Sequence, residues 1–242
     1  MADDSPCIDA VVAAALSSFA RRGYSETKLE ALAKNTGMTK RMIHYHFGDK
    51  KGLYVRALGL ALQQVAPPAD ILNRSHAVPV EGMRRFVDAL YFAFMDNPDA
   101  VRMVIRDNLD PVLGDDGVEL AAGLPGATDV TLHVERLLLA GQDAGAFRPG
   151  ISAQDVLVLI SSLCFFRVGN AVTALNVGHV DVERQRNVEG MRRLVIDTVL
   201  AFLTSNIPDS GYESYLETTA LPDAHAPADE FYDLYGDVGG LV

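Results

Sequence analysis

One stretch near the amino terminus, residues 29–47, constrains the fold more than any other part of this 242-residue chain. It reads LEALAKNTGMTKRMIHYHF. Leu29 and Leu32 have the spacing of neighbours on one face of a helix, and Gly37 suits the positive φ at which helices often end. Thr39 can cap a second, cationic helix. Two short helices joined by a glycine turn predict a helix-turn-helix unit, whose second helix fits the major groove of DNA.

The charge distribution favours a nucleic-acid partner although the chain as a whole is acidic. The formal net charge is −11, but residues 1–66 carry nine Lys and Arg against six Asp and Glu. Residues 67–207 carry twelve against eighteen, and residues 208–242 carry none against eight. Binding to DNA depends on the local field more than on the total charge. The amino-terminal block is therefore the part of the chain that we expect to contact DNA.

The residues around this unit resemble the DNA-binding domain of TetR-family transcriptional regulators. The matching positions are Phe19, Gly23-Tyr24, Leu32-Ala33, Gly37, Ile43, His46-Phe47, Lys50 and Leu53-Tyr54. Two positions depart from the family pattern. Lys28 stands where Ser or Thr is usual, which moves the expected helix cap back to Thr27, in a T-x-x-E capping box with Glu30. Arg41-Met42 replaces a pair of small residues at the end of the second helix that meets DNA bases.

The resemblance implies an all-α fold, in which a three-helix DNA-binding domain with a helix-turn-helix precedes a larger helical bundle for ligand binding and dimerisation. We expect the first domain at residues 1–52, the second at residues 53–207 and an acidic carboxy-terminal tail at residues 208–242. Outside the helix-turn-helix, apolar periodicity and turn residues predict further helices and a loop over 110–126. The predicted helices span residues 8–22, 49–66, 80–95, 98–109, 130–142, 152–177 and 182–207.

Nine residues are the predicted DNA contacts. Arg41 has the paired donors that bind a guanine edge, and Met42 suits contact with a thymine methyl group. The resemblance assigns His44, Tyr45 and Lys50 to phosphates, and Lys50 also stands at a helix start, where the helix dipole attracts anions. The alternative is that these side chains only solvate a surface helix. The full set is Thr27, Lys28, Thr39, Lys40, Arg41, Met42, His44, Tyr45 and Lys50.

No residue pattern indicates catalysis, a cofactor or a metal site. The sequence lacks G-x-S-x-G, G-x-G-x-x-G and H-E-x-x-H motifs. His44 and His46 lie two positions apart and would point to different sides of a helix, while Cys7 and Cys164 have no metal-type spacing. The amino terminus has no signal pattern, and the longest apolar run, residues 156–166, is too short to span a bilayer. These features predict a cytoplasmic protein that is not an enzyme.

An effector pocket is expected between helices of the second domain, where apolar side chains could surround a small molecule and a few polar groups orient it. Arg102 and Arg106 share one helical face and are candidate anchors for an acidic effector. The alternative is that the apolar stripe is ordinary core. The predicted lining consists of Phe86, Leu90, Phe94, Met103, Arg106, His133, Leu137, Phe166 and Asn170.

The last two long helices, residues 152–177 and 182–207, are the expected dimer surface. In the family that the chain resembles, such helices form a four-helix bundle with the same pair of the partner. The resemblance thus implies a homodimeric repressor of a palindromic operator, released by a small-molecule effector and without a membrane partner. The alternative is a ligand-sensing or interaction protein of the same fold that has lost specific DNA binding. The predicted interface residues are Leu157, Ile160, Leu163, Leu194, Thr198 and Phe202.

Two segments carry hypotheses about regulation. The helix over residues 49–66 is the expected physical link between the domains, and Pro67-Pro68 at its end would help it move as a rigid lever. The acidic tail, residues 208–242, is expected to be solvated or loosely docked. A second hypothesis is that the tail competes with DNA for the basic block.

Overall fold

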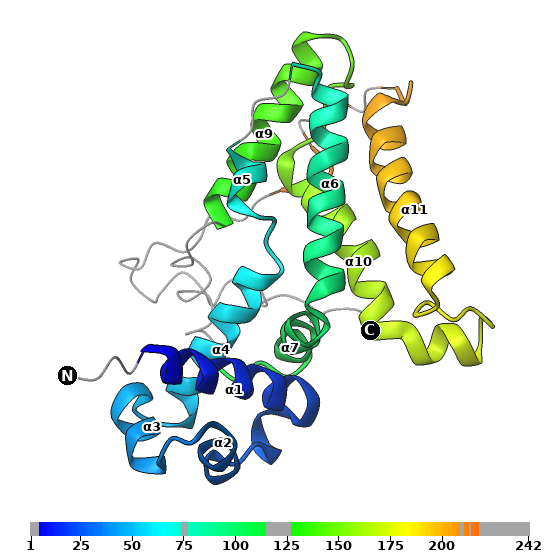
Figure 1. Ribbon diagram of the computed structural model, residues 1–242. Coiled ribbons are helices and arrows are strands. Elements are labelled where there is room, and N and C mark those ends of the chain that lie inside the picture. Colours follow the sequence, from blue (N-terminus) through cyan, green and yellow to red (C-terminus); the bar gives the residue numbers. More distant parts are fainter. Residues whose placement is uncertain (1–4, 74–76, 115–126, 209–210, 213, 218–242) are drawn as a thin grey trace, which may run out of the picture.

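The computed structural model describes residues 5–73, 77–114, 127–208, 211–212 and 214–217 (Figure 1). Within these ranges the secondary structure is helical and no residue lies in a strand, so the predicted all-α fold is confirmed. Helices α1 to α3 lie at the lower end of the molecule in Figure 1, and the longer helices α6, α9, α10 and α11 stand above them. Most of the predicted loop over 110–126 and most of the tail fall outside the described residues.

The amino-terminal helices begin and end where short-range capping groups require it. The C-cap of α2 is Gly37, with φ of 72°. Thr39 caps α3, because its hydroxyl accepts a hydrogen bond from the Met42 amide, and Asp49 caps α4 by accepting from the Gly52 amide at 2.8 Å. These three predictions are confirmed. The bounds are Ser5–Glu26 for α1, Leu29–Thr36 for α2, Lys40–Phe47 for α3 and Lys50–Gln64 for α4.

The predicted start of α2 is wrong. Lys28 is the N-cap residue and makes no side-chain cap, so the capping box of Thr27 with Glu30 does not form. Gly23, with φ of 84° and ψ of 173°, does end the straight part of α1 as predicted, but a further short helical turn follows it to Glu26. Thr27 then lies against α1, only 1% exposed, where its hydroxyl donates to the Gly23 carbonyl at 2.9 Å.

The carboxy-terminal helices agree with the prediction, except that the last one begins later in the sequence than predicted. A capping box of Ser152 and Asp155 opens α10, which confirms the predicted cap. The last helix, α11, begins at Gln185 and not just after Asp181, because the residues between them form a turn. In this turn the Asp181 carboxylate accepts from the Glu183 amide and the Asp181 carbonyl accepts from the Arg184 amide. The bounds are Ala69–Leu72 for α5, Pro79–Asp96 for α6, Pro98–Leu109 for α7, Ala127–Asp143 for α9, Ala153–Asn176 for α10 and Gln185–Thr204 for α11.

Two hydrophobic cores share helix α7. The first core unites the inner faces of α1 to α4 with Ala100 and Met103 of α7. The second core lies among α6, α9, α10 and α11 and includes Val101 of α7. Because α4 belongs to the first core as far as Ala61, the packing does not divide at residue 52. We therefore propose that α4 and one face of α7 belong with the amino-terminal helices.

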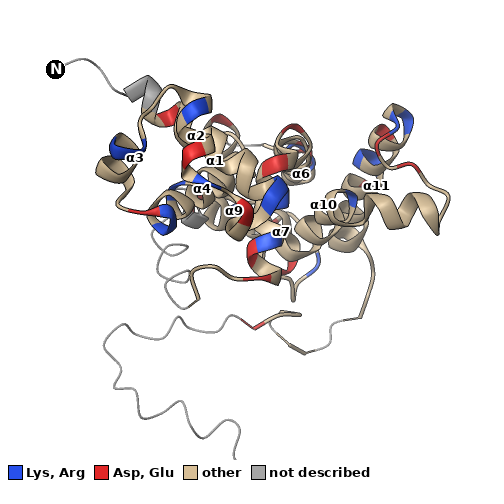
Figure 2. Cartoon of the chain, turned by 90° about the horizontal axis from the view of Figure 1, so that it is seen from below, with Lys and Arg blue, Asp and Glu red and all other residues tan. Residues whose placement is uncertain are grey.

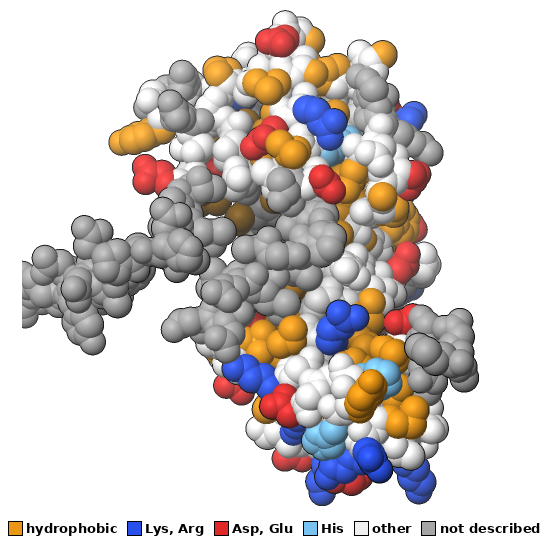
Figure 3. Space-filling view, turned by 90° about the vertical axis from the view of Figure 1, so that its left-hand side faces the viewer, with side chains coloured by type: hydrophobic (Ala, Val, Ile, Leu, Met, Phe, Trp, Pro, Cys, Tyr) orange, Lys and Arg blue, Asp and Glu red, His pale blue; other side chains and the backbone are white. Residues whose placement is uncertain are grey.

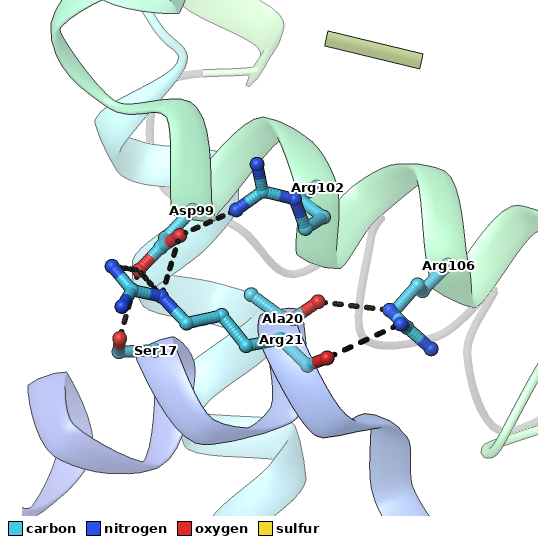
Figure 4. Close-up of polar contacts among 6 residues, drawn as sticks. All are labelled: Ser17, Ala20, Arg21, Asp99, Arg102 and Arg106. Atoms are coloured by element: carbon cyan, nitrogen blue, oxygen red, sulfur yellow. Dashed lines mark hydrogen bonds and ion pairs between the residues drawn. The ribbon is translucent and has the colours of Figure 1, made fainter. Parts of the chain in front are cut away.

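A charged seam joins α1 to α7 (Figure 4). The Asp99 carboxylate, in the first turn of α7, accepts from the Ser17 hydroxyl at 2.8 Å, from Arg21 at 3.0 Å and from Arg102 at 2.8 Å. Burial acts to raise the pKa of the Asp99 carboxyl, but the bonds from Arg21 and Ser17 and the two positive charges outweigh it. The net result is a pKa below the ordinary value. The carboxylate is therefore held in its charged form at neutral pH.

Arg106 closes the carboxy-terminal end of the straight part of α1. Its Nε donates to the carbonyl of Ala20 at 2.8 Å and its Nη2 to the carbonyl of Arg21 at 3.3 Å (Figure 4). These are two of the last carbonyls before the kink at Gly23, and carbonyls at a helix end have no partner within the helix. A cation there also complements the negative end of the helix dipole. A residue of α7 thus completes a helix of the amino-terminal core.

Helix α10 is long and apolar enough to cross a membrane by length and composition, with a mean hydropathy of 1.8 over its most apolar window. The expectation from the run at 156–166 alone is therefore corrected, because the helix extends well beyond that run. Only 17% of the window is buried within the chain. Most of the apolar surface of α10 is therefore left uncovered by its own chain.

Replacing Asp99 with Ala should weaken the seam. We expect the free energy of unfolding to fall by about 1–2 kcal/mol at pH 7, since a hydrogen-bonded carboxylate is lost at a partly exposed site. Because the native pKa is depressed, this stabilisation is present above the ordinary carboxyl pKa of about 3.9 and is lost as the pH falls through the lower native value. Urea unfolding of both proteins between pH 3 and pH 7 measures the difference.

The matched control is Asp143→Ala, which removes an exposed carboxylate at the end of α9. A loss of stability for Asp99→Ala no larger than that of the control would show that the seam does not stabilise the fold.

Candidate nucleic-acid interface

Helix α3 presents its polar side chains to solvent and buries one residue beneath them. Ile43 is fully buried in the first core, whereas Lys40, Arg41, His44 and Tyr45 are exposed. Tyr45 is 85% exposed, which is unusual for a large aromatic side chain. Figure 3 shows Lys, Arg and His side chains gathered at the lower end of the molecule, with acidic side chains among them. Helix α3 is therefore packed on the first core through Ile43, and its opposite face is open to solvent.

Met42 lies at the edge of this exposed surface. It is half-buried and packs against the first core. A prediction that treats Met42 only as a base-reading side chain is thus incomplete, because the same side chain also helps to seat α3 on the domain.

Lys40 is paired with an acidic residue of the neighbouring helix. Its ammonium lies 2.5 Å from a carboxylate oxygen of Glu30 on α2. The hydrogen bond from Lys40 is the main cause that lowers the pKa of Glu30. Both side chains are more than half exposed, and exposed pairs of this kind contribute little in water. A phosphate could therefore replace Glu30 as the partner of Lys40 at small cost.

His44 and Lys50 are both bound to the protein backbone. His44 Nδ1 lies 2.8 Å from the Gly48 carbonyl and must carry the proton, because a carbonyl only accepts. The Lys50 ammonium donates to the Ser25 carbonyl at 3.2 Å and lies 4.5 Å from the centre of the Tyr24 ring. His44 thus holds the end of its own helix at Gly48, whereas Lys50 ties the start of α4 to the end of α1. Their predicted phosphate contacts stay predictions.

Thr27 is removed from the set of DNA-contacting side chains, because it is buried and its hydroxyl is used within the domain. Thr39 keeps a place at the start of α3, where its hydroxyl caps the helix. Lys28 is exposed at the N-cap of α2. No sequence pattern indicated that Glu30 would pair with Lys40, since the two residues lie ten positions apart and meet only through the angle between α2 and α3.

The nine residues predicted to line an effector pocket do not surround one cavity. Met103 and Arg106 lie on α7 at the seam with α1. Phe166 and Asn170 are exposed on α10. The other five fill the second core or its edge, which corrects the prediction, because helical periodicity alone cannot distinguish core from cavity wall. They are Phe86, Leu90, Phe94, His133 and Leu137.

Two of the predicted dimer residues face their own chain. Ile160 is fully buried in the second core. The Phe202 ring lies against Tyr215 of the tail, at 5.5 Å between centroids, and beneath the Arg148 guanidinium. Leu157, Leu163 and Thr198 are half-buried, and Leu194 is exposed.

The tail segment that packs on Phe202 is anchored by Asp155. The Asp155 carboxylate accepts from the amides of Tyr215 and Leu216, at 3.2 and 2.9 Å. The beginning of the tail is therefore docked at the start of α10. The possibility that the tail competes with DNA concerns residues outside the described ranges.

Across the part of the chain that the structure describes, no group of three or more His, Cys, Asp and Glu residues could hold a metal ion. What the amino-terminal helices offer instead is a capped, exposed, cationic helix on a helix-turn-helix scaffold. Fold and site together define a helix-turn-helix DNA-binding regulator.

Comparison with known proteins names the family. Residues 11–57 match the family described as bacterial regulatory proteins, tetR family, and residues 79–199 match the family described as tetracyclin repressor-like, C-terminal domain. The chain belongs to the TetR family of transcriptional regulators.

Relatives and solved structures agree with this assignment. The HTH-type transcriptional repressor NicS of Pseudomonas putida is 25% identical over 174 residues, which cover 72% of this chain and 81% of NicS. The HTH-type transcriptional regulator RutR of Escherichia coli K12 is 24% identical over 197 residues, 78% of this chain and 89% of RutR. A tetR-family regulator from Rhodococcus RHA1 superposes with a TM-score of 0.61 at 20% identity, over 82% of this chain and 97% of that protein, and so shows the common fold.

Replacing Glu30 with Gln should strengthen DNA binding. The change removes the carboxylate that competes with phosphate for Lys40, so we expect roughly two- to fivefold tighter binding at low salt. The salt dependence should also become steeper by about one released ion. Fluorescence polarisation of a labelled duplex at several salt concentrations measures both quantities.

Glu135→Gln on α9 is the control, since Glu135 is exposed in the other domain and its loss changes the net charge equally. If both variants bind DNA equally well, Lys40 does not contact phosphate.

Proposed function

We propose that this protein is a homodimeric cytoplasmic repressor that binds a palindromic DNA operator and leaves it when a small-molecule effector binds. The observation that carries the proposal is the exposed first turn of α3, with Lys40 and Arg41 standing above the buried Ile43. The Pseudomonas relative carries the name of a repressor, which supports the same direction of regulation.

Recognition would take place at the start of α3. In a groove-inserted helix the amino-terminal turn meets base edges, and here that turn holds Thr39, Lys40, Arg41 and Met42. Arg41 is exposed, and its guanidinium makes no hydrogen bond or ion pair within the part of the chain that the structure describes. Its guanidinium can therefore bind a guanine without first losing an internal bond. Lys28 and Tyr45 are placed to contact the sugar-phosphate backbone, which fixes position and not sequence.

A second copy of the chain would cover α10. Val158, Phe166, Val172 and Leu175 are all at least 45% exposed on this helix, and Leu194 is exposed on α11. Several exposed apolar side chains on neighbouring helices favour an interface. In both Figure 1 and Figure 2, α3 lies on the opposite side of the molecule from α11. A dimer formed through α10 and α11 would thus leave both α3 helices open to read two half-sites.

Replacing Arg41 with Ala should cost about 1–3 kcal/mol of binding free energy on the preferred operator and relax the sequence preference at one position. Selection from a random duplex library identifies the operator, and polarisation titrations measure the affinity of each variant. Arg136→Ala, at an exposed site on α9, is the control.

Equal losses on the operator and on random DNA would show that Arg41 contacts only the backbone. Failure of the unmodified protein to prefer any duplex would favour a sensor that has lost specific DNA binding.

Replacing Val172 with Glu should convert the dimer to monomers. Val172 is 72% exposed on α10, and a charge buried there by the partner would be unpaired. Sedimentation velocity at micromolar concentration measures the change. Leu139→Glu on α9, at a residue 61% exposed, should leave the dimer intact. A Val172→Glu protein that still sediments as a dimer would place the interface elsewhere.

A further inference from the structure

A cavity of about 360 Å³ lies where α1, α4, α7 and α10 meet. Its size is near the lower end of the range for small-molecule sites, so it suits one small organic compound. The walls come from the DNA-binding helices on one side and from α10, the helix of the proposed dimer, on the other. Among its lining residues are Phe19, Tyr24, Tyr54, Arg102, Arg106 and Val168.

We call this cavity the seam cavity. One of its walls is aromatic. The rings of Phe19, Tyr24 and Tyr54 lie 5.0 to 5.9 Å apart between centroids. The Tyr54 hydroxyl donates to Asp107 at 2.7 Å, which fixes that ring in place. Aromatic walls favour planar ligands, which bury much area and interact with the ring edges and faces.

The other wall is cationic. Arg102 and Arg106 line the cavity, against one acidic lining residue, Asp110. Arg102 uses Nη1 for Asp99, and Arg106 uses Nε and Nη2 for the carbonyls of α1. The remaining guanidinium nitrogens of both residues make no hydrogen bond to any part of the chain that the structure describes. A guanidinium with free donors binds carboxylates in preference to neutral groups.

The position of Arg106 also links the cavity to α1. Its Nη1 lies 3.2 Å from the point where a Cβ of Gly23 would stand, so the guanidinium sits directly at the kink of α1. A ligand carboxylate is a stronger acceptor than a neutral carbonyl. Once bound, it would draw Arg106 away from Ala20 and Arg21 and leave the end of α1 without its cap.

We propose that the seam cavity binds a small aromatic carboxylate, and that Arg106 exchanges the carbonyls of α1 for this ligand. The effect of the ligand on DNA binding rests on the proposed function. The ligand loosens α1 from α7, and this changes the orientation of the two α3 helices relative to α10 and α11. The ligand site itself does not depend on DNA binding.

Calorimetric titration of the DNA-free chain tests the site, with benzoate and 2-naphthoate as probes and their neutral amides as matched controls. We expect at least one acid to bind at least tenfold more tightly than its amide. Arg106→Gln should remove this preference, and Arg84→Gln, at a residue of α6 that pairs with Glu81, should keep it. Val168→Phe, which fills the cavity and leaves Arg106 in place, should abolish binding.

Three results would overturn the site. They are the absence of binding by both acids at millimolar concentration, equal binding of acid and amide, and unchanged binding by Val168→Phe. Circular dichroism of each variant confirms that it is folded.

A second titration tests the coupling. The acid that binds should weaken operator affinity at least tenfold for the unmodified protein and leave the Val168→Phe protein unaffected. Binding of the acid without any change in operator affinity would overturn the exchange at Arg106. A chain that binds no operator would instead refute the proposed function, while the calorimetry would still decide the ligand site.

Discussion

The contact between α1 and α7 is the constraint on which the rest of the structure depends. Helix α7 contributes Ala100 and Met103 to the amino-terminal core and Val101 to the other. Its two ends add charged bonds to α1, through Asp99 at the start and Arg106 near the finish. A helix shared between two cores cannot shift toward one without disturbing the other, because protein interiors are close-packed. The orientation of the reading helix is therefore set by the carboxy-terminal domain.

The distribution of charge explains how a protein with an acidic total charge can bind DNA. The net charge of −11 is distributed over the long helices and the tail, whereas the exposed cations of α2 and α3 occupy one end of the molecule. The range of unscreened electrostatic attraction at physiological salt is only about 8 Å. Carboxylates farther than this from α3 are therefore screened, whereas Glu30 lies directly beside Lys40.

Features that depend on a few neighbouring residues could be predicted from the sequence. The caps at Thr39, Asp49 and Ser152 each involve groups within three positions, and all three formed. Features that depend on contacts between residues far apart in the sequence could not be predicted. The burial of Thr27 follows from the short turn after Gly23, which brings Thr27 against Ser18 of α1. The role of Arg106 follows from a contact across more than eighty positions.

The predicted effector pocket met the same limit: Met103 and Arg106 line the seam cavity, whereas the other seven predicted residues do not. An apolar stripe shows that a helix face is covered, but the stripe does not reveal whether side chains or a ligand cover it. The family pattern supplied the fold and the DNA-binding helix, and only the arrangement of α1, α4, α7 and α10 reveals where a cavity lies.

Native-state hydrogen exchange of the DNA-free protein tests the central claim most directly, since it measures the free energy at which each helix opens. If α7 joins the DNA-binding helices to the second domain, the slowest amides of α1, α4 and α7 should open together with one free energy. Amides of α1 and α4 that open at a clearly lower free energy than those of α7 would show that the reading domain unfolds by itself, and would contradict the account.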